Sequence, residues 1–400
     1  MKILQLCNKP PIPPSDGGTI AMNNLTKGLF HAQNEVHTMG LATPKHPYHP
    51  TAVSKEYQTN HQPSFVFHNT VATFTGAIKG IFTRDSYHLT RFYSPELENR
   101  IIRKIKAWQP DVILFESLFM QPYFEAVNAH SSALKVYRAH NIEYTLWKKR
   151  QNDEKNPFKQ WLLKQLIPKL ERAEKQFINQ VDAVVPISKL DSITVQDWSK
   201  NEQIHLTPFG FDFTELPERV PTEKDKSLIF LGALDWQPNI DGLIWFSEKC
   251  WPEIYDKHPN WVFKIAGRNA YDQVNKIRGE GIEYLGEVES AWEYYSKGGI
   301  MIVPLFTGSG MRVKIIEAMA AQVPIISTTQ GLEGITCTPG KHMELADNKP
   351  QFVEAVERLI HQKNHRENMA KEAYQMVSEH YDCYQQGKEL SHFLQSILKS

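Results

Sequence analysis

Short apolar runs alternate along the chain with segments of helical periodicity. The first half contains such runs at residues 3–7, 111–115, 133–137 and 183–187, and the second half at 228–231, 262–266, 300–303 and 324–327. Apolar runs of this length that alternate with helical segments are typical of βαβ units and parallel sheets. The pattern therefore predicts an α/β protein with two parallel sheets, one in each half.

The length of the chain also favours two domains. Its 400 residues exceed the roughly 250–300 at which a single hydrophobic core usually stops growing. Residues 216–226 (LPERVPTEKDK) contain prolines and charges and almost no apolar side chains, as expected of a linker or surface loop. We predict a first domain over residues 1–210 and a second over residues 211–381.

Charge and cysteine content exclude several classes of protein. The 45 basic and 45 acidic residues cancel, so no overall positive field attracts nucleic acid. The four cysteines lack the spacing of a zinc site or a disulfide framework, which favours a reducing compartment. Because there is no signal-like segment and no 18-residue apolar run, we expect a cytoplasmic protein.

The segment from Trp147 to Lys175 combines basic residues with aromatic and aliphatic ones. This composition fits a weak peripheral membrane contact, which could hold the protein at the inner membrane face. The composition favours the alternative, an amphipathic helix that packs on its own domain with its lysines in solvent. Pro157 and Pro168 are expected to interrupt the segment.

The glycine-rich stretch from Pro304 to Glu317 (PLFTGSGMRVKIIE) is a candidate phosphate site. A predicted strand ends there, Gly308, Ser309 and Gly310 form a turn, and a helix follows. Glycines allow backbone amides to approach a ligand, and a helix N-terminus offers unpaired N–H donors with partial positive charge. We therefore expect these three residues to bind a phosphate group.

Three charged residues follow this turn. Arg312 and Lys314 lie in the first helical turn, where the helix dipole disfavours cations, so a bound anion would offset the penalty. The alternative is that both side chains simply reach solvent. Glu317 could form an ion pair with Lys314, or its two oxygens could accept hydrogen bonds from a vicinal diol such as a ribose.

The first half carries further candidates at the ends of predicted strands. Gly17 and Gly18 precede a predicted helix, where they could contact a phosphate or form a simple turn. Asp16, just before them, could cap the same helix. His140 could contact a sugar hydroxyl or serve a structural role. Glu116, and Glu333 in the second half, are expected to be loop or capping residues.

Together these motifs resemble a glycosyltransferase of the GT-B fold, similar to the large retaining family four. The motifs that carry the resemblance, spread over the whole chain, are Gly17-Gly18, His140-Asn141, Pro208-Phe209-Gly210, Phe230-Leu231-Gly232 with Pro238-Asn239, Ala266-Gly267-Arg268, and Gly308 to Glu317 followed by Ala318-Met319-Ala320. The resemblance implies two Rossmann-like domains that face each other across a cleft. It also implies a C-terminal helix, about residues 382–400, that crosses back to complete the first domain.

The resemblance further implies a hexosyltransferase-like enzyme of polysaccharide biosynthesis. A nucleoside-diphosphate sugar would be the donor and a saccharide or lipid-linked glycan the acceptor, and transfer would retain the anomeric configuration. Glu317 would hold the donor ribose, Arg312 and Lys314 its diphosphate, and Gly18 would approach the same phosphates from the first domain. His140 would lie near the transferred sugar.

The sequence departs from the family pattern at two places. Ser309 stands where the family usually has a glutamate, eight residues before Glu317, which leaves the sugar selectivity open. An Arg/Lys pair is absent from residues 232–237, and Arg312 and Lys314 are expected to supply that charge. No DxD-like cluster occurs near the expected site, so we expect no metal and no other cofactor. A sugar-nucleotide epimerase and a non-catalytic nucleotide-sugar-binding subunit remain as alternatives.

Overall fold

The computed structural model describes the chain except for residues 201, 217–225, 269–273, 275, 309 and 400. Most of the expected linker, and Ser309 of the expected phosphate turn, therefore lie outside the described residues. The chain divides into two compact units, one made of Met1–Gly210 with Cys383–Ser400 and the other of Phe211–Asp382.

The first unit is built on a six-stranded parallel sheet. Its strands lie in the order β3-β2-β1-β4-β5-β6. Their bounds are β1 Lys2–Cys7, β2 Glu35–Ala42, β3 Ser64–Phe67, β4 Val112–Glu116, β5 Leu134–Ala139 and β6 Ala183–Pro186. β1 and β4 are buried along almost their whole length, as expected of strands covered on both faces.

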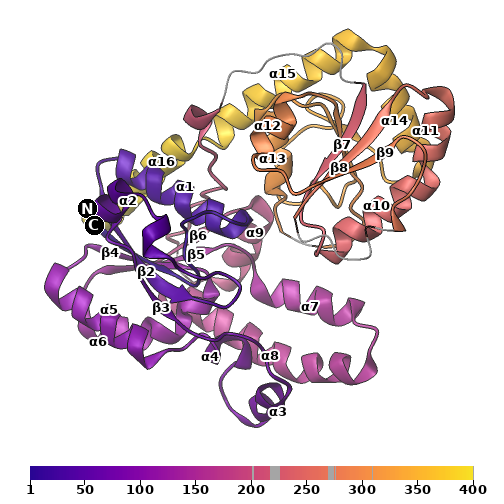
Figure 1. Ribbon diagram of the computed structural model, residues 1–400. Helices are drawn as coiled ribbons and strands as arrows, with labels where there is room; N and C mark the ends of the chain where they lie inside the picture. The colour runs from indigo at the N-terminus through magenta and orange to yellow at the C-terminus, as the bar shows by residue number, and fades with distance from the viewer. Residues whose placement is uncertain (201, 217–225, 269–273, 275, 309, 400) are drawn as a thin grey trace. The chain divides into compact units, whose positions relative to one another are not determined.

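The second unit repeats this arrangement (Figure 1). Its strands lie in the order β12-β11-β10-β7-β8-β9, and Figure 1 labels β7, β8 and β9 among them. Their bounds are β7 Ser227–Leu231, β8 Val262–Ala266, β9 Ile282–Gly286, β10 Ile300–Val303, β11 Ile325–Ser327 and β12 Glu344–Leu345. Numbered from the first strand of each unit, both sheets have the order 3-2-1-4-5-6 of a dinucleotide-binding fold. The two predicted parallel sheets are confirmed.

Helices connect the strands in both units. In the first unit they are α1 Gly17–His31, α2 Lys55–His61, α3 Phe74–Phe82, α4 Tyr87–Thr90, α5 Pro95–Trp108, α6 Phe124–His130, α7 Glu143–Asp153, α8 Pro157–Gln180, α9 Lys189–Trp198 and α16 Cys383–Lys399. In the second they are α10 Gln237–Lys249, α11 Trp251–Lys257, α12 Ala291–Ser296, α13 Val313–Ala320, α14 Lys349–His361 and α15 Lys363–His380. Short 3-10 turns occur at Pro50–Ala52, Leu118–Tyr123 and Phe213–Glu215.

The last helix belongs to the first unit, as expected. Figure 1 shows α16 beside α1, and Leu390 and Leu394 of α16 share a buried cluster with Leu25 and Leu29 of α1. Backbones approach closely, because a Cβ added to Gly387 would lie 2.1 Å from the carbonyl carbon of Gly28. The carboxyl-terminal segment thus completes the core of the amino-terminal unit.

The expected interruption at two prolines is only partly correct. Pro157 stands in the first turn of α8, where the missing N–H has no intrahelical partner to lose. Pro168 lies inside α8, which continues to Gln180, so the expectation that it interrupts the segment is wrong. Among the residues that the structure describes, no helix is long and apolar enough to cross a membrane.

The sheet order marks where ligands bind in such folds. The chain leaves neighbouring central strands in opposite directions at β1/β4 and at β7/β10, and a crevice forms outside the carboxyl ends of such strands. The stretch from Pro304 to Glu317 follows β10. Gly17 and Gly18 begin α1, the helix that follows β1, and Glu116 is the last residue of β4. Each unit therefore carries candidate residues at its own switch point.

Candidate functional site

In the second unit, the turn after β10 has the backbone conformation that its glycines permit. Gly308 and Gly310 have φ angles of +99° and +85°, in the left-handed region. A Cβ added to Gly308 would lie 2.8 Å from the ring of Trp236. A side chain at this position would therefore both strain the backbone and collide with the tryptophan.

Arg312 is the residue immediately before α13. It is buried, its guanidinium lies 5.2 Å from the ring centre of Trp236, and its Nη1 donates to the carbonyl oxygen of Gly310. Burial lowers the pKa of Arg312 to about 10, although the nearby Glu333 opposes the shift. The predicted alternative, in which this side chain simply reaches solvent, is wrong.

Lys314 turns its ammonium group toward the end of β7. Its Nζ donates to Oδ1 of Asn239 over 3.0 Å and lies 4.2 Å from the ring centre of Phe230. A Cβ added to Gly232 would lie 3.3 Å from the same Nζ. Lys314 therefore brings positive charge to the loop after β7, where the expected Arg/Lys pair is missing.

The environment of Lys314 is costly for a charge. Burial lowers the pKa of Lys314 to about 7, and Arg312 lowers it further. Two cations held close together in a partly dry environment are characteristic of an anion site. This arrangement favours a ligand with at least one phosphate group.

Glu317 lies one turn further along α13. Burial raises its pKa to about 7, and among the described residues none donates a hydrogen bond to its carboxylate or pairs with it. The alternative of a Lys314–Glu317 ion pair is therefore not observed, because Lys314 bonds to Asn239 instead. A half-buried carboxylate without a protein partner is suited to accept hydrogen bonds from a ligand.

Sequence reasoning missed part of this site. Asn239 holds Lys314 through Oδ1 while its Nδ2 donates to the carbonyl of Ala233 over 2.7 Å, and Trp236 covers Arg312. Gln330 connects the carbonyl of Gly308 with the carboxylate of Glu333, at 3.1 and 2.7 Å. Glu333 therefore supports the glycine turn, which agrees with its expected role as a loop residue.

In the first unit, Asp16 occupies the amino end of α1. Its side chain accepts from the backbone N–H of Thr19, so the expected cap is present. Lys9 and His46 bind the same carboxylate at 2.7 and 2.8 Å. Burial would raise the pKa of Asp16, but its bonds to His46 and Lys9 hold the pKa well below its usual range.

Gly18 lies against this cluster. A Cβ added to Gly18 would lie 3.0 Å from Nζ of Lys9, a lysine that the sequence analysis did not select. Gly17 and Gly18 are the first residues of α1, directly after the Asp16 cap. The amino end of α1 therefore combines a lysine with glycines, which keeps the expected phosphate contact by Gly17 and Gly18 as a prediction.

His140 follows β5 and binds Glu116 at the end of β4. The distance from Nε2 of His140 to Oε2 of Glu116 is 2.5 Å. With a carboxylate as its partner, Nε2 is the nitrogen that carries the proton, which leaves the Nδ1 lone pair as an acceptor. Burial lowers the pKa of His140 even though Glu116 opposes the shift, so a neutral ring is favoured.

Glu116 is not the loop or capping residue that the sequence suggested. It is the last residue of β4 and is fully buried, with Gln5 at 2.7 Å and Arg138 at 3.2 Å in addition to His140. Burial alone would raise its pKa, but Arg138, His140 and Gln5 together hold the pKa at about 2. This charged network fixes the orientation of His140.

The second unit matches a known protein family. Residues 225–362 match the family described as "Glycosyl transferases group 1". The chain is 25% identical over 260 residues to an uncharacterized 44.6 kDa protein in the cps region of Klebsiella pneumoniae, a match that covers 62% of this chain and 65% of that one. It thus spans just under two thirds of the length of this relative.

Two further likenesses agree with this match. The chain is 30% identical over 112 residues to the Bacillus subtilis (strain 168) protein TuaC, a putative teichuronic acid biosynthesis glycosyltransferase, which covers 27% of this chain and 28% of TuaC. The crystal structure of Anabaena HepE in complex with UDP and glucose superposes with a TM-score of 0.67 at 12% identity, over 99% of this chain and 100% of HepE. The resemblance to the GT-B glycosyltransferases and the two-domain α/β fold are confirmed.

Proposed function

We propose that this chain is a glycosyltransferase that moves a sugar from a nucleoside-diphosphate sugar to a glycan acceptor. The observation that carries the proposal is the group at the start of α13, at the β7/β10 switch point. It consists of Arg312, Lys314 and Glu317, whose carboxylate has no partner within the described part of the chain. The match of residues 225–362 to the group 1 glycosyl transferases supports it.

In the proposed complex, Gly308 and Gly310 offer backbone amides to the diphosphate, and Arg312 and Lys314 neutralise it. Glu317 accepts from the two ribose hydroxyls. Because HepE was solved with UDP and glucose, UDP-glucose is the first donor to test. The residues named above are proposed to contact the diphosphate and the ribose, not the base. Sugar nucleotides with other bases should therefore be tested beside UDP-glucose.

Transfer breaks the bond between the anomeric carbon and the phosphate oxygen, and the nucleoside diphosphate leaves with the bonding electrons. The acceptor oxygen forms the new bond to the anomeric carbon, and its proton passes to the departing diphosphate or to solvent. Negative charge then accumulates on the departing diphosphate, where preorganised donors have most effect. Arg312 and Lys314 supply fixed positive charge there, which is the basis for proposing a reaction without a metal. Retention of configuration is proposed from the family resemblance.

We propose that His140 and Gly18 act from the first unit. The Nδ1 lone pair of His140 is suited to accept a hydrogen bond from a sugar hydroxyl, because Glu116 holds the other ring nitrogen. Gly18, beside Lys9, would approach the donor phosphates.

The acceptor that we propose is a saccharide or lipid-linked glycan of a cell-surface polysaccharide. The cps-region relative and the teichuronic acid relative support this class.

An exposed aromatic group, Phe74 with Phe158 and Trp161, would give the protein a weak contact with the inner membrane face, because residues 155–170 contain lysines and no acidic residue. Trp161→Ser should reduce sedimentation with phosphatidylglycerol vesicles and leave the low binding to phosphatidylcholine vesicles unchanged.

The donor site is tested by calorimetry with a panel of sugar nucleotides and nucleoside diphosphates. We expect one nucleotide class to bind, and we expect Glu317→Ala and Arg312→Ala to weaken binding, while the exposed Glu248→Ala does not. Transfer is then measured as the release of nucleoside diphosphate from the bound donor when a glycan extract is added as acceptor. Absence of binding to any member of the panel would overturn the proposal, and conversion of the donor to an isomeric sugar nucleotide would favour an epimerase instead. Binding without any turnover would favour a non-catalytic subunit.

A further inference from the structure

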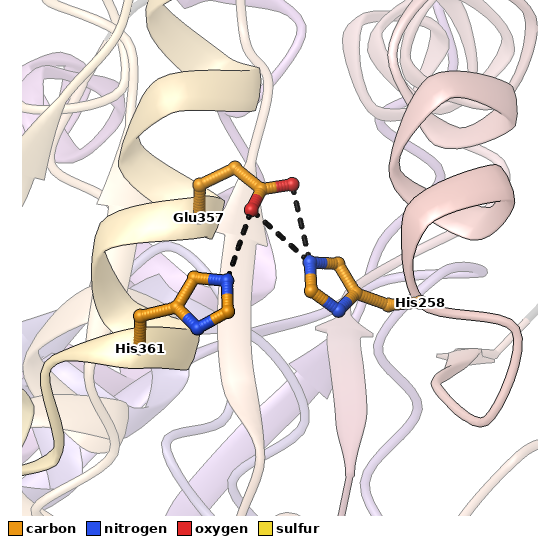
Figure 2. A group of neighbouring side chains, drawn as sticks. All are labelled: His258, Glu357 and His361. Carbon is orange, nitrogen blue, oxygen red and sulfur yellow. Dashed lines mark hydrogen bonds and ion pairs between the residues drawn. The ribbon is translucent and has the colours of Figure 1, made fainter.

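Three potential metal ligands converge on the surface of the second unit, outside the donor site (Figure 2). His258 follows α11, while Glu357 and His361 lie one turn apart on α14. Nε2 of His258 lies 3.2 and 3.1 Å from the two carboxylate oxygens of Glu357, and Nε2 of His361 lies 3.3 Å from Oε2. The imidazole and carboxylate ligand atoms all lie within 4.8 Å of one another.

The separations between the imidazoles and the Glu357 carboxylate match the spacing of ligands around a small metal ion. At metal–ligand distances of about 2.0–2.2 Å, neighbouring ligands of a tetrahedral site are about 3.3 Å apart. The two distances from the imidazoles to Glu357 already have this value. The spacing of four residues between Glu357 and His361 places both on one face of α14, so only His258 has to come from another element.

From this geometry we propose that His258, Glu357 and His361 bind one divalent transition-metal ion, with Zn²⁺ as the best match. Two imidazole nitrogens and one carboxylate oxygen are ligands that zinc and cobalt accept, whereas magnesium and calcium prefer oxygen ligands alone. Three protein ligands leave a further coordination position for water. His361 is 66% exposed, so the ion can enter from solvent.

One neighbouring charge opposes the metal only weakly. Nζ of Lys257 lies 3.9 Å from Oε1 of Glu357 but only 3.3 Å from Glu253, its partner on the same helix. Both histidines contact Oε2 of Glu357, whereas the contact of Lys257 is with the other oxygen, Oε1. The carboxylate therefore keeps one oxygen for the ion.

The position of the cluster separates it from sugar transfer. His258 lies just before β8 begins, and His361 is the last residue of α14, so both lie toward the amino-terminal edge of the sheet. The donor residues follow the carboxyl ends of β7 and β10, at the opposite edge. A metal bound here would join α11 to α14 and stabilise the second unit without contacting the donor.

The test is titration of the chelator-treated full chain with Zn²⁺ by calorimetry, followed by Co²⁺ and its visible absorption. We expect one equivalent to bind to the wild type, with a rise in the midpoint of thermal unfolding. Loss of a residue that only supports a ligand typically costs about 10–100-fold in metal affinity, so loss of a ligand itself in His258→Ala or His361→Ala should weaken binding by at least this factor and remove the rise. Circular dichroism of each variant shows whether it is folded.

His365→Ala is the matched control. His365 lies on the next helix and binds Glu344 at 2.9 Å, but it is not part of the group of three potential ligands found among the described residues. It should retain the full affinity for Zn²⁺. The proposal is overturned if the wild type binds no stoichiometric ion, or if both cluster variants bind Zn²⁺ as tightly as the wild type.

Discussion

Glu317 is placed where its charge costs stability. Burial raises its pKa to about 7, above the value near 4.3 of an unfolded chain, so the folded state disfavours the ionised form. The penalty is absent below about pH 4.3, grows between that pH and 7, and is complete above 7. A residue that lowers stability at neutral pH and lacks a protein partner is more readily explained by a ligand than by folding.

We therefore predict that Glu317→Gln stabilises the protein and abolishes donor binding. Because one pKa unit corresponds to about 1.4 kcal/mol, the rise of the pKa from about 4.3 to about 7 gives a gain at pH 8 of at most about 4 kcal/mol, and the gain should be close to zero at pH 4.5. Urea unfolding at both pH values measures it, with Glu248→Gln as the exposed control. A loss of stability at pH 8 would show that the carboxylate serves the fold.

Lys314 should couple donor binding to pH. Its pKa of about 7 means that it is mostly neutral at pH 8 in the free protein, whereas a bound diphosphate favours the protonated ammonium. Affinity for the nucleoside diphosphate should therefore fall with rising pH above 7, approaching tenfold per pH unit, and binding at pH 8 should take up close to one proton.

Calorimetry in two buffers of different ionisation enthalpy measures this proton uptake. Lys314→Met should bind more weakly and take up no proton, whereas Lys249→Met, at an exposed position on α10, should behave as the wild type. Equal proton uptake by the wild type and Lys314→Met would assign the proton to another group.

At the level of elements, the contact between α1 and α16 depends on two glycines. A Cβ on Gly28 would lie 2.1 Å from the carbonyl oxygen of Cys383, and one on Gly387 would lie equally close to Gly28. Gly387→Val should destabilise the first unit by about 1–3 kcal/mol or more, because the helices cannot stay in contact without a backbone shift. Lys388→Val introduces the same side chain at an exposed position and should cost much less. Similar unfolding midpoints for the two variants would contradict this account.

The elements that the sequence predicted are those with long apolar runs. β2 was missed because its buried positions include His37, Thr38 and Gly40, which hide the apolar pattern even though the strand lies next to β1. β12 has only two residues and β9 is a half-exposed edge strand, so neither produces a continuous apolar run. Burial created by neighbours, which a linear pattern does not encode, explains why β2 was missed, whereas β9 was missed because it is half-exposed and β12 because it is short.

Some residues of the candidate site could be predicted from the sequence and others could not. Gly308, Gly310 and the charges after them could be selected because their chemistry lies within one short segment. Asn239, which holds Lys314 from 75 residues away, could not, because only folding brings the two together. Glu116 was undervalued for the same reason, since its partners come from β1 and β5.

At the scale of the whole molecule, the two units differ in how the chain builds them. The second is continuous from Phe211 to Asp382, and its ends are paired, because the N–H of Phe211 donates to the carbonyl of Tyr381 over 2.6 Å. The first needs residues from both ends of the chain, since Leu390 and Leu394 belong to its buried core. Paired ends favour folding as an independent domain.

We predict that residues 211–382 alone fold and bind the nucleoside diphosphate, because Arg312, Lys314 and Glu317 all lie within them. Circular dichroism and calorimetry of this segment, with its Glu317→Ala variant as control, measure both properties. Residues 1–210 alone should instead fail to unfold cooperatively, because removal of α16 exposes the apolar face of α1. If the segment folds but binds no nucleotide that the full chain binds, then Gly17, Gly18 and Lys9 of the first unit supply an essential part of the donor site.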